Sequence, residues 1–317
     1  MTRDLLLLRS GKARAAHGEA DSERPLKDRG KRSVQRIGVW LAGHGLVPRH
    51  VVAAATERAR VSGQKALKAA GVGAGALQTD ARLTNAGVVG QLAVLGDCGS
   101  LPGPVMLVLP GKSLRRLLRH VLAADETPSQ LGSGSLVQLS LPDDWSRLGA
   151  GCARLVTVVR SQDLPQRFPF DGPDGPEWRD RPAYYYRQSA VIPYRRGASG
   201  LEILVIRSSK HTHWVVPKGI HDPGYSAQDS AAKEAEEEAG VLGDVHADPL
   251  GSFDLDKWGA TCRVAVYPMH VTAILGESAW DESHRSRHWV TPAQAIARLR
   301  GEGLKRIVAA FAAQGPV

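Results

Sequence analysis

The segment SQDLPQRFPFDGPDGPEWRDRP at 161–182 limits how this chain can fold, because it holds five prolines. Proline fixes φ and has no backbone N–H, and this segment shows no apolar periodicity, so the sequence favours an extended linker there. We therefore predict one domain at 1–160 and another at 183–317. A length of 317 residues is also typical of two domains.

Before the linker, short apolar runs alternate with amphipathic helical patterns. Strands are predicted at 4–10 (DLLLLRS), 51–55 (VVAAA) and 105–109 (VMLVL). Helices are predicted at 32–45 and 113–123, where apolar residues recur at helical spacing. This alternation is typical of a three-layer α/β domain with a mainly parallel sheet.

After the linker, the strands cluster instead. The runs AVIPYRR at 190–196 and LEILVIRS at 201–208 flank a glycine turn and predict a hairpin. A long strand is predicted at 262–274, and a helix with Thr291 as N-cap and Pro292 at its first position comes after it. We expect an α+β sandwich in this half.

Charge and cysteine content restrict the partners and the compartment. The net charge of +9 favours anionic partners, but the basic residues are dispersed and no base-reading motif is present. Nucleic acid is therefore the less favoured partner, although it stays open. The longest aliphatic run, Leu5–Leu8, is too short to span a membrane. Three scattered cysteines, Cys98, Cys152 and Cys262, indicate free thiols and a cytoplasmic protein.

A short predicted helix carries an unusual concentration of glutamates, within GIHDPGYSAQDSAAKEAEEEAGV at 219–241. Ser226 is its predicted N-cap, and Gly240 stands where a left-handed residue ends a helix. Alanines recur every four residues from 227 to 239 and form a narrow stripe suited to close packing on a sheet.

The glutamates of this helix fall on two faces. Glu234, Glu237 and Glu238 lie within one arc of about 100°, whereas Glu236 points away. Like charges at this spacing repel, so the three are either solvated or neutralised by a cation. Oxygen ligands of this kind suit Mg²⁺, which takes one or two carboxylates together with water and substrate phosphates.

The surroundings of the glutamates resemble the Nudix box, G-x5-E-x7-R-E-U-x-E-E-x-G-U with U aliphatic. Gly219, Glu234, Glu237, Glu238 and Gly240 match its conserved letters. The runs AVIPYRR, VIRSSKHTHWVVPKG and WDESHRSRHWV extend the likeness over 183–317 and resemble the diphosphoinositol-polyphosphate phosphohydrolase branch of the Nudix hydrolases.

Two positions depart from the box. Tyr225 stands in place of its first glutamate and Lys233 in place of its arginine. Lysine keeps the charge but lacks the bidentate fork that would orient a neighbouring carboxylate. These changes put the rate in question more than the family.

The resemblance implies hydrolysis of a phosphoanhydride (P–O–P) bond in a nucleoside or inositol diphosphate-type substrate, a small organic pyrophosphate. It implies a metal site for Mg²⁺ or Mn²⁺ at Gly219, Glu234, Glu237 and Glu238. The three glutamates are the catalytic candidates, and which of them acts as general base stays open. The implied phosphate-binding residues are Arg195, Ser208, Ser209, Lys210, Lys218 and Arg285.

Two other functions stay open for this half. The departures at Tyr225 and Lys233 would suit a non-catalytic polyphosphate or nucleotide sensor, in which the site binds without turnover. An RNA 5′-pyrophosphohydrolase would share the chemistry but needs a groove for an RNA chain.

The beginning of the chain, LLLLRSGKA, resembles the LLLLRHGKA signature of the histidine phosphatase superfamily, and the run RPLKDRGKRSVQRIGVWLAGHGLVP is similar to SixA-type phosphohistidine phosphatases. Ser10 replaces the nucleophilic histidine, Asn85 the acid and Pro110 the second histidine, whereas Arg9 and Arg58 match phosphate-binding arginines. The histidines that residues 1–160 do contain fall at other places in the pattern; they are His17, His44, His50 and His120.

Without an imidazole nucleophile the resemblance implies a pseudophosphatase. We expect Arg9, Ser10 and Arg58 to keep a vestigial pocket for an anionic ligand, since paired guanidinium groups suit phosphate. The alternative is that the arginines form ordinary ion pairs and the domain serves for packing only.

Overall fold

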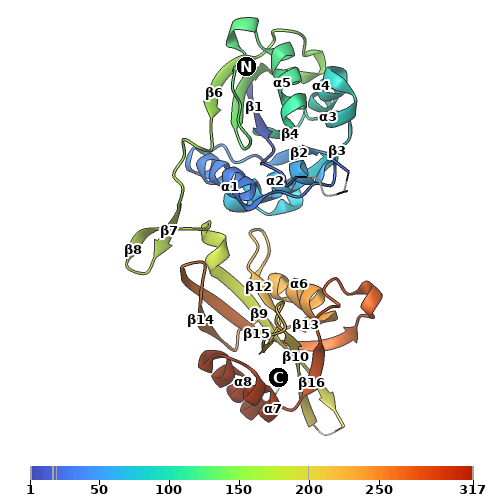
Figure 1. Cartoon of the computed structure of the whole chain (residues 1–317), viewed down its shortest axis with the longest axis vertical. Coiled ribbons are helices and arrows are strands. Elements are labelled where there is room, and N and C mark those ends of the chain that lie inside the picture. Colours follow the sequence, from blue (N-terminus) through green and yellow to red (C-terminus); the bar gives the residue numbers. More distant parts are fainter. Residues whose placement is uncertain (1, 16–17, 19, 199, 316–317) are drawn as a thin grey trace. The chain divides into compact units, whose positions relative to one another are not determined.

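The computed structural model describes residues 2–15, 18, 20–198 and 200–315. It divides into two compact units, Met1–Pro182 and Ala183–Val317 (Figure 1). Within the described residues no helix is both long and apolar enough to cross a membrane. All three cysteines are free, as predicted, and Cys98 and Cys262 are buried.

A six-stranded sheet with the order β3-β2-β4-β1-β5-β6 forms the centre of the first unit. The first four of these are parallel, and β5 and β6 are antiparallel. Every side chain of Leu5–Leu8 and of Val105–Leu109 is fully buried, because both faces of the sheet are covered. The strands are β1 (Thr2–Arg9), β2 (His50–Ala54), β3 (Leu77–Asp80), β4 (Val105–Leu109), β5 (Leu136–Pro142) and β6 (Arg154–Val159).

Helices cover both faces of this sheet. Figure 1 shows α1 and α2 on one face and α4 and α5 on the other. This confirms the predicted three-layer α/β class with a mainly parallel sheet. The helices are α1 (Asp28–Gly43), α2 (Glu57–Ala69), α3 (Arg82–Asn85), α4 (Gly87–Asp97) and α5 (Gly111–Val121). Short 3-10 helices lie at Ala74–Ala76, Ala124–Glu126 and Trp145–Arg147.

The prediction of an extended linker at 161–182 is wrong for its middle part. There β7 (Phe168–Gly172) and β8 (Gly175–Arg179) pair as an antiparallel hairpin. Phe168 is buried, and it lines an apolar groove together with Trp40 of α1. Prolines are tolerated because a two-stranded sheet has an unpaired edge on both strands, so a missing N–H breaks no interior ladder.

The second unit is built on a sheet of eight strands in which β9 is central. β15 runs parallel to β9, whereas the other pairs are antiparallel. The predicted hairpin is confirmed as β9 and β10. The strands are β9 (Arg187–Gly197), β10 (Gly200–Arg207), β11 (Trp214–Val215), β12 (Lys218–Ile220), β13 (Val241–Val245), β14 (Gly251–Lys257), β15 (Ala260–Ile274) and β16 (Arg287–Val290).

The two faces of this sheet carry separate cores, because successive side chains of a strand point to opposite faces. Val191 packs with the alanines of α6 (Ala227–Ala239), and Ile192 packs with residues of α7 (Pro292–Arg298) and α8 (Glu302–Gln314). Figure 1 shows α6 on one side of the sheet and α7 with α8 on the other. The predicted α+β sandwich is confirmed. Two more 3-10 helices lie at Ala183–Tyr186 and Glu277–Ala279.

Candidate functional site

The helix α6 begins and ends where its sequence predicts. The Ser226 side chain caps it by accepting a hydrogen bond of 3.0 Å from the backbone N–H of Asp229. Gly240 adopts the left-handed conformation, with φ 60° and ψ 42°. Both terminal signals are local, so they act whatever the rest of the fold does.

A stripe of alanines brings α6 close to the sheet. Ala231, Ala235 and Ala239 are fully buried against it. On the neighbouring strand β12, a Cβ atom added at Gly219 would lie 1.9 Å from Oε1 of Glu234. The glycine therefore allows the Glu234 carboxylate to lie directly against the strand backbone, a contact that no other residue type permits.

Glu234 differs from the other two glutamates of its face because its charge is met only at a distance, by Lys233 and Lys257 among the described residues. No hydrogen bond or ion pair between described residues engages its carboxylate. Burial raises the pKa of Glu234 to about 7, and the negative charges of Glu238 and Glu237 add to the effect. A cation near these oxygens would remove the repulsion.

Glu238 is held by two donors from other elements. The backbone N–H of Lys218 donates to its Oε2 at 3.0 Å, and Nη2 of Arg285 donates to its Oε1 at 2.9 Å. Arg285 is itself buried and forms a second ion pair with Glu282 at 2.5 Å. Burial raises the pKa of Glu238, against the lowering effects of Lys218 and Arg285.

The other two glutamates lie on the predicted faces. Glu237 forms an ion pair of 2.9 Å with Lys233 one turn before it, so the lysine that replaces the arginine of the box does contact a catalytic candidate. Glu236 is exposed, as expected for a residue that points away from the other three.

Backbone oxygens at the end of α6 are capped by residues 280–287, which end at the first residue of β16. Nε1 of Trp280 and the N–H of Glu282 both donate to the carbonyl of Glu237, at 3.1 and 3.2 Å. Arg287 donates to the carbonyls of Ala239 and Gly240, each at 2.9 Å. These bonds satisfy C-terminal carbonyls that a helix leaves unpaired, and they fix the turn that carries the glutamates.

The glutamates differ in how well they would suit a divalent cation. Among the described residues, no group of three or more His, Cys, Asp or Glu side chains is arranged to hold a metal ion. Lys233 and Arg285 each engage one of the other two glutamates of this face. Glu234 offers a carboxylate without a partner beside the bare backbone of Gly219, and hard cations prefer such oxygens. The donor set thus fits a cation centred on Glu234.

The predicted phosphate-binding residues divide into two groups. Lys218 and Arg285 lie directly against Glu238. By contrast, no hydrogen bond or ion pair between described residues joins the other four to the glutamates. Arg195 pairs with Glu202 at 2.7 Å and stacks on Trp289, which packs on the α6 face of the sheet. The remaining three, Ser208, Ser209 and Lys210, lie in the loop between β10 and β11.

One basic residue near the glutamates was not predicted. Lys257, at the end of β14, lies close enough to Lys218, Glu234 and Glu238 to interact with them electrostatically. Burial, and then the charge of Lys218, lower the pKa of Lys257. Its sequence gives no signal, because β14 reaches the site only through its pairing with β15.

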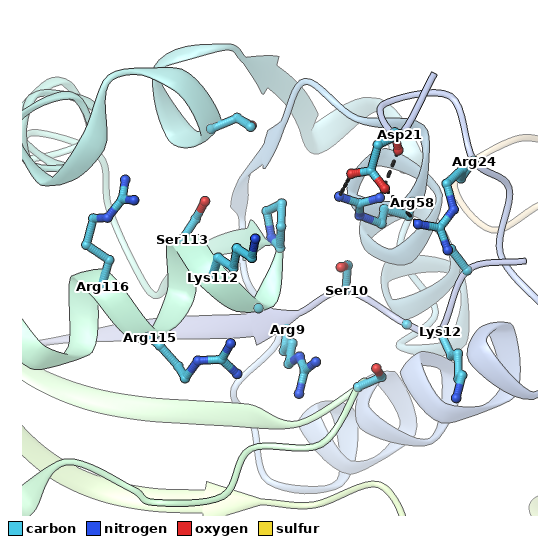
Figure 2. A pocket seen from close by; sticks show the side chains of 16 residues that line it. Arg9, Ser10, Lys12, Asp21, Arg24, Arg58, Lys112, Ser113, Arg115 and Arg116 are labelled. Carbon is cyan, nitrogen blue, oxygen red and sulfur yellow. Dashed lines mark hydrogen bonds and ion pairs between the residues drawn. The ribbon is translucent and has the colours of Figure 1, made fainter. Parts of the chain in front are cut away.

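The N-terminal unit brings its predicted residues together as well. Arg9, Ser10 and Arg58 line one pocket of about 790 Å³, which Pro110 also lines, whereas Asn85 lies outside it (Figure 2). None of the described residues that line this pocket is a histidine. His17 lies outside the described residues.

Comparisons with known proteins match each half of the chain to a different group. A family model described as NUDIX domain matches residues 185–311. Nudix hydrolase 12, mitochondrial, of Arabidopsis thaliana is 30% identical over 158 residues, which cover 42% of this chain and 77% of that protein. Diphosphoinositol polyphosphate phosphohydrolase 3-beta of Bos taurus is 31% identical over 123 residues, which cover 38% of this chain and 72% of that protein.

A solved structure of a phosphohistidine phosphatase SixA from Nakamurella multipartitia is similar to the other half. It is 25% identical with a TM-score of 0.43, and the match covers 50% of this chain and 96% of that one.

Proposed function

Because the chain belongs to the Nudix hydrolase family, we propose that its C-terminal unit hydrolyses a P–O–P bond in a small organic pyrophosphate. The observation that carries this proposal is the Glu234 carboxylate, which lies unpartnered against Gly219 with Glu237 and Glu238 beside it. A solvated acidic face would instead leave these side chains exposed, and Glu238 is buried.

Some residues of the site would bind the metal ion, and others would position the metal-binding carboxylates. Glu234, with Glu237 and Glu238 beside it, would hold Mg²⁺ or Mn²⁺ next to the backbone of Gly219. When bound, such a cation offsets charge on the phosphates and lowers the pKa of water. Arg285 keeps the Glu238 carboxylate in place through its hydrogen bond of 2.9 Å.

Basic side chains around the glutamates would bind the substrate phosphates. Lys218 and Lys257 lie near the glutamates, and Arg195 lies on the same face of the sheet. Ser208, Ser209 and Lys210 would reach phosphates from their loop. The substrate class we propose is a nucleoside or inositol diphosphate, and the bovine relative is named for a diphosphoinositol polyphosphate.

A second function is favoured by one contact. Lys233 already neutralises Glu237 at 2.9 Å, which weakens the case for a cation there and suits a sensor that binds polyphosphate without cleaving it. An activity panel with Mg²⁺ or Mn²⁺ separates the two. It comprises diadenosine polyphosphates, inositol pyrophosphates, oxidised nucleotides, ADP-ribose and 5′-triphosphorylated RNA. We expect turnover of at least one small molecule. If none of the compounds is turned over, the non-catalytic sensor is the function that remains.

Substitution of single glutamates tests the residues. Glu237→Gln removes a charge with little change of shape, and we expect kcat to fall by at least about a hundredfold. We expect Glu238→Gln to lower kcat by the same factor. The matched control is Glu236→Gln, one residue away on the exposed side of the same helix, which should be close to neutral. Near-normal rates in both test variants, with folding intact, would remove the metal-site proposal.

For the N-terminal unit we propose that no phosphatase reaction takes place. Ser10 and Pro110 line a pocket that has no histidine among its described residues, so the imidazole that the reaction needs is lacking there. The full chain should release no phosphate from phosphohistidine or generic phosphoesters. Activity that Ser10→Ala abolishes would contradict this. We place the protein in the cytoplasm, a proposal that its three free cysteines support.

A further inference from the structure

The pocket of the N-terminal unit is strongly cationic. Its lining includes seven basic side chains and one carboxylate, Asp21. The whole chain carries 41 basic and 32 acidic residues, so this surplus is local and not a reflection of composition. The basic residues that line it are Arg9, Lys12, Arg24, Arg58, Lys112, Arg115 and Arg116.

One side of the pocket has an internal counterion. Asp21 forms ion pairs of 2.7 Å with both Arg24 and Arg58. Its side chain is 66% exposed, so water and dissolved anions reach this ion pair. Hydrogen bonds from Arg58 and then Arg24 lower the pKa of Asp21 to about 2.

On the opposite side of the pocket, the described residues supply no counterion. Lys112, Arg115 and Arg116 project from α5, and no carboxylate of the described residues pairs with them. Figure 2 shows them and the Asp21–Arg58 pair on either side of Ser10. Burial, and then the charge of Arg115, lower the pKa of Arg9, which lies between. Like charges are thus gathered here without a carboxylate partner among the residues that the structure describes.

Uncharged donors complete the site between the two sides. Ser10 and Ser113 are 5% and 7% exposed, and neither hydroxyl has a hydrogen-bond partner among the described residues. The first turn of α5 begins at Pro110 without a side-chain cap, so its N–H groups are free to bind an anion. Gly111 keeps this turn close to Arg9, since a Cβ there would lie 2.7 Å from Nε of Arg9.

We propose that this pocket binds a small ligand with two or more linked phosphate groups, and that one of these groups displaces Asp21 from Arg58. A single phosphate would reach one cationic side and leave the other unmatched. Linked phosphates reach both sides across the hydroxyl of Ser10. The ligand is bound and not cleaved, and the proposal does not depend on the reaction of the C-terminal unit.

The test uses the full chain in EDTA, where divalent cations are absent. Calorimetric titrations with orthophosphate, tripolyphosphate and ATP compare one phosphate with several. We expect tripolyphosphate to bind at least about tenfold tighter than orthophosphate, since its further phosphates add charge-assisted hydrogen bonds on the second side. ATP binding tighter than tripolyphosphate would identify a nucleotide as the source of the phosphates, and weaker binding would identify an inorganic chain.

Variants locate the binding. Arg115→Ala with Arg116→Ala should weaken tripolyphosphate at least about tenfold and leave orthophosphate nearly unchanged. Arg119→Ala is the matched control, because it is an exposed arginine of the same helix outside the pocket. Asp21→Asn should strengthen binding by removing the competing carboxylate. The proposal is overturned if no anion binds, if the double variant behaves like Arg119→Ala, or if Asp21→Asn weakens binding.

Discussion

The substitution Gly219→Ala should displace one carboxylate of the site, that of Glu234, and so test how much its position matters for catalysis. The new Cβ would lie 1.9 Å from Oε1 of Glu234, and real Cβ contacts do not fall below 3.0 Å, so the carboxylate must move by at least about 1.1 Å. The clash is with the end of a flexible side chain, so the strand keeps its pairing with β9. A displacement of about 1 Å in a reacting group can lower a rate a hundredfold, and we expect kcat to fall by about that factor.

Two controls make this result specific. Gly276→Ala has nothing within 4 Å of the new Cβ and an ordinary φ of −68°, so it should leave the rate and the melting temperature unchanged. If the clash acts through Glu234, then Gly219→Ala combined with Glu234→Gln should be no slower than Glu234→Gln alone. A kcat within about threefold of the parent in a folded Gly219→Ala protein would refute the reasoning, because the carboxylate could then move without consequence.

Two further predictions concern charge. Arg285→Met should lower the free energy of unfolding by about 3 kcal/mol in urea titrations, because it leaves the buried Glu238 without its cation; a loss below about 1 kcal/mol would mean that water reaches the carboxylate. The pKa of Asp21 is lowered from 3.8 to about 2 in the folded state, so its stabilisation is present above about pH 4 and lost as the pH falls towards 2. The unfolding free energies of the parent and Asp21→Asn should converge over that range; since Asp21 is largely exposed, the difference should stay below about 1 kcal/mol, and a constant difference would contradict the linkage.

Local signals were the ones that the sequence predicted well. The caps at Ser226 and Thr291, Pro292 at the first helical position and the left-handed Gly240 all depend on residues within one turn of each other. The apolar run at Leu5–Leu8 likewise predicted a strand, and in the structure all four side chains are fully buried. In each of these regions the backbone chemistry is settled by neighbours in the chain.

Long-range contacts could not be predicted in the same way. Arg285 is 47 residues from Glu238, and its use as a buried partner depends on how the segment before β16 folds over α6. Lys257 reaches the glutamates only because β14 pairs with β15. In the N-terminal unit, Asp21 lies 37 residues from Arg58, so the sequence resemblance that indicated the arginine carried no information about its counterion.

The prolines at 161–182 show why composition misled. Pro169 pairs with Trp178 and Pro176 with Asp171 in a hairpin whose strands are both edges. The hairpin packs against the rest of the first unit through Phe168, whose side chain is buried near Trp40. Five prolines in 22 residues argue against a regular interior strand, but they do not exclude a two-stranded hairpin.

The capping of α6 by Trp280, Glu282 and Arg287 has a consequence for local opening. Alanine side chains bury little apolar area. The packing of α6 on the second unit is therefore stabilised in large part by these hydrogen bonds to its last carbonyls. Helix and capping segment should therefore open as one cooperative unit. In native-state hydrogen exchange the amides of α6 and of 280–287 should share a protection factor, and Trp280→Ala should lower both together.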